Sequence, residues 1–130
     1  MPNWTPNWQD VRWDHGASDA AISALGCAAS EVDRMTGERA RVARTLLGEW
    51  RGAHRESFDE RLRRAGGDDT ALAGDLRRAA QMLARLSQRA REEQARRVRE
   101  RAEWERERER ERRRAREDAA ARKGQNNAGA

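Results

Sequence analysis

Apolar residues at a three-four spacing on both sides of one short turn constrain this chain more than any other feature. The spacing is carried by Ile22, Leu25, Ala29, Val32, Ala43 and Leu46 before the turn, and by Phe58, Leu62, Leu72, Leu76, Leu83 and Leu86 after it. Residues three and four apart share one face of a helix. Between the two segments stands Trp50-Arg51-Gly52, where glycine reaches positive φ at low cost and lets the chain reverse. The sequence therefore predicts an antiparallel helical hairpin with Trp50 at its closed end.

The ends of the two helices follow from capping and breaker residues. Either Asp14 or Ser18 is a suitable N-cap for the first helix, which is expected to run to about residue 49. In the second segment the pair Gly66-Gly67 is a potential break, yet the apolar phase passes it without a slip. We therefore expect one helix across the pair, weakened or kinked there. The alternative is a stop at the glycines and a fresh cap at one of the two aspartates that follow.

Little of the chain is available for a hydrophobic core. It has 130 residues, of which 39% are charged, and its mean hydropathy is −1.20. Two helices cannot cover their apolar stripes in a single hairpin, so a second hairpin is needed. The predicted fold is all-α, a hairpin that pairs into a four-helix-bundle dimer. Its expected hairpin or dimer core is Ile22, Leu25, Val32, Leu46, Phe58, Leu62, Leu72, Leu76, Leu83 and Leu86.

A helix, a Trp-x-Gly turn and a second helix resemble the WXG family of small type VII secretion proteins. The resemblance covers residues 18–95 and rests on Trp50, Gly52 and the later Phe58. It implies a hairpin that pairs with itself, with a related hairpin or with the helical N-terminal domain of an effector. It also implies a secreted substrate or targeting partner that meets the secretion ATPase.

The family's tail motif, Tyr-x-x-x-Asp or Glu, is missing, because the chain has no tyrosine and Trp104 is followed four residues later by Arg108. The resemblance then implies either that a partner supplies the signal across a dimer, or that the chain stays in the cytoplasm and helps a larger secreted protein.

An N-terminal arm, residues 1–13, precedes the expected hairpin of residues 14–95, whose turn is expected near 49–53. The arm contains Trp4, Trp8 and Trp13, and its two prolines argue against a long helix. We expect it to pack over this hairpin or over a partner's hairpin. The alternative is an exposed aromatic patch that docks on another protein.

Residues 96–130 are expected to form an Arg/Glu-rich tail. Residues 89–130 carry 15 basic and 10 acidic side chains, so they hold the whole net charge of +5. Opposite charges three and four apart predict a solvated helix, with Trp104 as a further docking candidate and with a disordered end over 119–130. The interleaved acids argue against nucleic-acid binding. The alternative function is nevertheless a cytoplasmic helical scaffold or nucleic-acid-associated protein with a basic tail.

Nothing in the sequence points to an enzyme, a cofactor or a metal. His15 and His54 have no second ligand at metal-binding spacing, and Cys27 is the single cysteine. No signal peptide opens the chain and no apolar run reaches the length of a membrane span. We expect a protein that is cytoplasmic before export and is secreted, if at all, by the type VII route.

Overall fold

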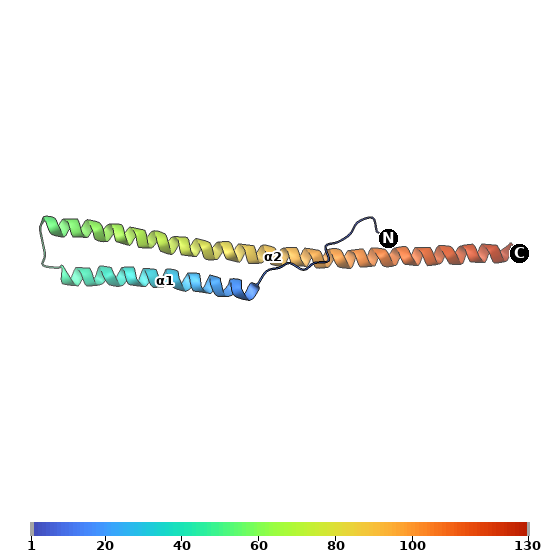
Figure 1. Ribbon diagram of the computed structural model, residues 1–130, viewed down its shortest axis with the longest axis horizontal. Coiled ribbons are helices and arrows are strands. Elements are labelled where there is room, and N and C mark those ends of the chain that lie inside the picture. The colour runs from blue at the N-terminus through green and yellow to red at the C-terminus, as the bar shows by residue number, and fades with distance from the viewer. Residues whose placement is uncertain (1, 130) are drawn as a thin grey trace. The chain divides into compact units, whose positions relative to one another are not determined.

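Two helices make up the computed structural model, which describes residues 2–129. Helix α1 is His15–Leu46 and helix α2 is Ala53–Ala128, and no strand occurs among the described residues. The first part of α2 lies antiparallel to α1 (Figure 1). The all-α hairpin predicted from the apolar spacing is confirmed.

Helix α1 begins at the first of its two predicted caps and ends earlier than expected. The Asp14 carboxylate accepts a hydrogen bond from the Ala17 N–H at 2.9 Å, which satisfies one free N–H of the first turn. The helix ends at Leu46, three residues before the predicted end at residue 49. The reason is local: the Trp50 N–H donates to the Leu47 carbonyl at 3.1 Å, which closes a turn.

Helix α2 is longer than its apolar stripe. It runs unbroken through Gly66-Gly67, as the unslipped phase predicts, and continues to Ala128. The expectation of disorder from residue 119 onward is therefore wrong for the described residues. Residues 119–121 are three successive alanines, the strongest helix formers, and they extend the charged helix in front of them.

The chain divides into two compact units. One is the hairpin of residues 14–88, and the other joins the arm, residues 2–13, to residues 89–129. The division differs from the expected boundary at residue 95. Hydrogen bonds join the arm to residues 94–107 of α2, within its own unit. Its expected packing over this hairpin or a partner's hairpin stays a prediction.

Small side chains line the seam of the hairpin. Ala29 is fully buried and Ala73 is 1% exposed. The buried hydroxyls of Ser18 and Ser87 lie 2.6 Å apart and share a hydrogen bond between the helices. Such small residues let two helices approach closely at the crossing.

A polar layer interrupts this seam near its middle. The Asp69 carboxylate accepts hydrogen bonds from the Thr36 hydroxyl at 2.9 Å and from the Arg39 guanidinium at 2.7 Å. These two bonds hold the pKa of Asp69 below its usual value of 3.8. Since both donors belong to α1 and the acceptor to α2, the layer fixes one register of α1 against α2.

Candidate interaction surfaces

The predicted core residues divide into two groups. Six are half-buried in the hairpin: Ile22, Leu25, Val32, Leu62, Leu76 and Leu83. The other four, Leu46, Phe58, Leu72 and Leu86, are between 38% and 76% exposed. These four do not lie in the core of the hairpin, and their predicted place in a dimer core stays a prediction. Within the seam the buried residues lie one position later, at Ala73 and Ser87.

Six of the exposed large apolar residues of the hairpin lie on one flank, a set that does not count the exposed Met82 and Trp50. We call this surface the apolar flank; it consists of Met35, Val42, Leu46, Phe58, Leu72 and Leu86. An ion pair of Arg77 with Asp33, at 2.5 Å, marks the opposite side of the two helices. Arg77 follows Leu72 by five positions, which is a rotation of about 140° around α2. Met35 follows Asp33 by two positions, which is a rotation of about 160° around α1. Both apolar residues therefore face away from the ion pair.

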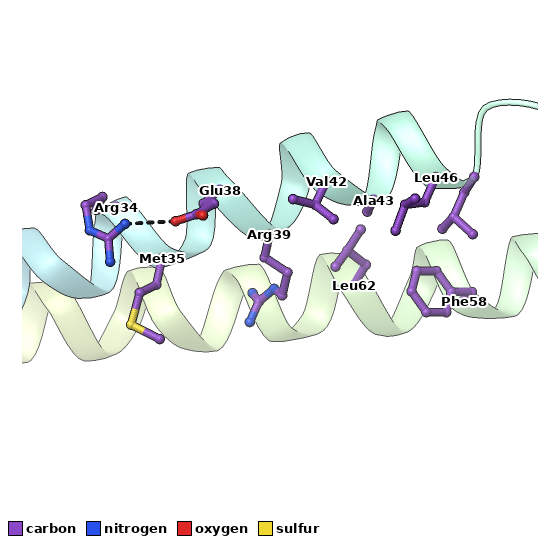
Figure 2. Close-up of a pocket in the computed structure, with 10 residues that line it drawn as sticks. Arg34, Met35, Glu38, Arg39, Val42, Ala43, Leu46, Phe58 and Leu62 are labelled. Atoms are coloured by element: carbon purple, nitrogen blue, oxygen red, sulfur yellow. Dashed lines mark hydrogen bonds and ion pairs between the residues drawn. The ribbon is translucent and has the colours of Figure 1, made fainter.

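A groove opens in the apolar flank beside the turn. Its volume is about 550 Å³. Figure 2 shows Val42 and Leu46 from α1 and Phe58 and Leu62 from α2 lying around it. The remaining lining residues are Arg34, Met35, Glu38, Arg39, Ala43 and Leu47. The groove is thus an apolar depression with an ionic rim, where Arg34 pairs with Glu38 at 2.8 Å.

Trp50 and Gly52 lie in the connection between the helices. Trp50 is 42% exposed, and its ring centroid lies 6.2 Å from that of Phe58 at an angle of 52°. Gly52 has a φ of 111°, the left-handed region that favours glycine. The Arg55 guanidinium donates to the carbonyls of Leu47 and, at 3.0 Å, of Trp50. Sequence reasoning missed Arg55, although a cation facing the end of the preceding helix was a usable signal.

In the other unit, the arm is held on α2 mainly through its backbone. The Trp104 indole N–H donates to the Trp4 carbonyl at 3.0 Å. Arg101 donates to the carbonyls of Asn7, at 2.9 Å, and Gln9, at 2.7 Å. Arg97 donates to the same Gln9 carbonyl at 2.9 Å, and the Val11 N–H donates to the Gln94 amide oxygen at 2.8 Å. The arm runs antiparallel to α2, since later arm residues meet earlier helix residues.

Aromatic and charged side chains add to these backbone contacts. Trp8 and Trp104 stack edge to face with ring centroids 5.4 Å apart, and the Trp4 indole N–H donates to Glu107 at 2.7 Å. The Asp10 carboxylate accepts from Gln94 at 2.9 Å and from Arg101 at 2.8 Å, and these bonds lower the pKa of Asp10.

The structure thus brings together three of the four predicted docking tryptophans. Trp4 and Trp104 are half-buried and Trp8 is 50% exposed. The fourth, Trp13, is half-buried at the end of the arm. Sequence reasoning missed the helix residues that hold the arm: Gln94, Arg97, Arg101 and Glu107.

Among residues 2–129, no group of three or more His, Cys, Asp or Glu side chains is placed to hold a metal ion. Cys27 is exposed. Neither helix contains, within the described chain, a stretch apolar enough to cross a membrane.

Comparison with known proteins adds no relative: no family model, curated protein or solved structure matches the chain.

Proposed function

We propose that the chain is a non-enzymatic interaction protein that pairs with a second helical hairpin and so forms a four-helix bundle. The observation that carries the proposal is the apolar flank, six large apolar side chains exposed on one side of the hairpin. The 32 residues of α1 give this side a length of about 48 Å. Burying each Leu, Met or Phe is worth about 1.5–3 kcal/mol when burial is complete, which favours a partner.

The partner surface that fits best is a second apolar hairpin face. The ionic groups that line the groove are paired: Arg34 with Glu38 at the rim, and Arg39 with Asp69 of α2. A matching apolar stripe would fill the groove beside Val42 and Phe58. The partner is this chain itself, a related hairpin protein or the helical N-terminal domain of a larger effector.

The setting we propose is type VII secretion, with the chain as secreted substrate or targeting partner. The resemblance to the WXG family supports it, together with a half-exposed Trp50 and a positive φ at Gly52 in the connection of the hairpin. Because the chain has no tyrosine, the partner hairpin supplies the missing tail signal. The secretion ATPase then binds a signal that the two chains form together.

Pairing is tested by placing a charge on the apolar flank. Leu72→Glu should shift the purified protein toward monomer in sedimentation equilibrium, because burying an unpaired carboxylate in the interface is costly. Val98→Glu is the matched control, since Val98 is similarly exposed, at 51% against 49% for Leu72, but lies outside the hairpin unit. The proposed four-helix bundle is wrong if the parent and both variants sediment as monomers that unfold cooperatively at micromolar concentration. This result must also hold when hairpin proteins encoded nearby are co-expressed.

Export is tested separately in the producing cells. The protein should appear in the culture filtrate only when the secretion ATPase is intact. A protein that pairs normally but stays inside the cells under both conditions would instead support the cytoplasmic scaffold.

A further inference from the structure

The face of α2 over residues 94–107 has a composition suited to a non-helical partner. In the hairpin, most seam side chains of α2 are small or apolar, such as Ala73, Leu76 and Leu83, and Asp69 is the charged exception. Over 94–104 four half-buried positions, Gln94, Arg97, Arg101 and Trp104, continue this spacing, and the half-buried Glu100 is occupied by an ion pair with Arg96. All four side chains carry hydrogen-bond donors. A second helix could offer them only side-chain acceptors, because its own backbone carbonyls are already bonded within it.

An extended segment has the opposite requirement, since its backbone groups lack internal partners. The arm is such a segment: no helix or strand is assigned over residues 2–13. Three of its carbonyls, those of Trp4, Asn7 and Gln9, accept hydrogen bonds from this face of α2, and the Val11 N–H donates to it. Recognition is therefore mainly of backbone, with selectivity added by side chains.

Selectivity comes from the two ends of the contact. The edge-to-face contact of Trp8 with Trp104 and the bond from Trp4 to Glu107 select for aromatic residues at one end. At the other end Asp10 pairs at 2.8 Å with Arg101, whose side chain is only 19% exposed. The site thus fits an extended peptide with two tryptophans four residues apart and an acid two residues later.

We propose that residues 94–107 of α2 form a peptide-binding site, filled in this structure by the chain's own arm, and that the arm of a second copy enters it in trans. The arm comes from a second copy of the chain, because every copy presents the same segment that the site holds here. The site lies wholly in the unit that contains the arm, so arm exchange does not depend on pairing through the apolar flank.

The test is complementation between two full-length variants. One has a damaged site, Arg101→Gln with Trp104→Ala, and an intact arm. The other has a damaged arm, Trp4→Ala with Trp8→Ala, and an intact site. Neither can dock its arm in cis, so protection regained on mixing reports arm exchange alone. The readout is hydrogen exchange at the Val11 amide, followed by NMR with ¹⁵N only in the site-damaged chain.

In the parent protein the Val11 amide should be protected, and in the labelled variant alone its exchange should be faster by about tenfold or more, the effect of losing one or two hydrogen bonds. Adding excess unlabelled arm-damaged protein should slow that exchange again by a similar factor. Adding the unlabelled site-damaged variant is the matched control and should change nothing. Circular dichroism shows that each variant remains helical, and the milder Arg101→Gln alone replaces the double variant if it does not.

Two results overturn the proposal. A Val11 amide that is unprotected in the parent protein removes the binding site. Exchange in the labelled chain that stays fast at any excess of arm-damaged partner removes the trans occupant. Sedimentation of the same mixtures separates these failures from a failure of the hairpin to pair, because pairing through the apolar flank does not protect Val11.

Discussion

Trp50 combines two properties at the residue scale, contact with Phe58 and 42% exposure of its own surface. A fully buried tryptophan would cost about 3–5 kcal/mol on truncation, so a half-covered one should cost about 2 kcal/mol. We therefore expect Trp50→Ala to lower stability modestly and to impair export or partner capture strongly, because exposed aromatics act as binding anchors. Trp50→Phe should restore most of the stability. Paired melting and export measurements check this; a Trp50→Ala protein that matches the parent in both removes Trp50 from the mechanism.

Asp69 gives the hairpin a dependence on acid pH. In the folded state the hydrogen bond from the Thr36 hydroxyl lowers the pKa of Asp69 below 3.8 most strongly, and the bond from the Arg39 guanidinium adds to this effect. A carboxylate with a lowered folded pKa stabilises the fold above its unfolded pKa, and this stability is lost as the pH falls through the folded value. The stability difference between parent and Asp69→Asn should therefore be largest above about pH 4 and shrink below it. Urea unfolding at several pH values measures it, with exposed Asp68→Asn as control for the loss of one charge.

At the scale of the helices, the sequence predicted which faces are apolar but not which flank of the stripe is covered. Leu72 and Ala73 both continue the three-four spacing, and the same holds for Leu86 and Ser87. The large residues suggest a core, yet close approach of α1 favours the small ones, and Ala73 is 1% exposed against 49% for Leu72. Size complementarity between two helices is a tertiary property, which periodicity along one helix does not contain.

The continuity of α2 was predictable because the unbroken spacing of its apolar residues outweighs the low helix propensity of the two glycines. A loop at Gly66-Gly67 would have been free to lose the register, and the register is kept. Gly67 is exposed and lies inside the helix, and a methyl group added to it would meet no other side chain within 4 Å. Gly67→Ala should therefore raise the free energy of unfolding by about 1 kcal/mol.

Gly52→Ala is the matched control in the connection, because its φ of 111° disfavours any side chain. This variant should lose about 1–2 kcal/mol. Thermal melting of both variants checks the pair, and a stabilising Gly52→Ala would contradict the conformation of the turn.

At the scale of the whole chain, the two units use one helix for different contacts. In the hairpin α2 meets α1 mainly through small and apolar side chains, with the Asp69 layer and the Arg77–Asp33 pair as polar contacts. Beyond residue 88 it meets the arm through arginines, a glutamine and Trp104. The second set could not be recognised from composition, because arginines among glutamates are most often solvated. Their role depends on the arm, which lies more than 80 residues away in sequence. The sequence analysis singled out the tryptophans of the arm and Trp104 as docking candidates, but it did not predict that the two segments meet.

Deleting residues 2–13 should therefore affect one unit and spare the other. Without the arm, Arg101 loses its ion-pair partner Asp10 and the carbonyls of Asn7 and Gln9. We expect backbone hydrogen exchange over residues 89–107 to become faster by about tenfold or more, as two or more hydrogen bonds are lost. Mass spectrometry of peptic fragments measures both units in one sample.

The hairpin unit is the internal reference in this experiment. Exchange over residues 14–88 should stay nearly unchanged, because the Ser18–Ser87 bond and the Asp69 layer lie within the hairpin. Thr5→Ala, an exposed change within the arm, is the control for altering the arm without removing its contacts. Equal loss of protection in both regions would show that the arm stabilises the hairpin too, and the division at residue 88 would be wrong.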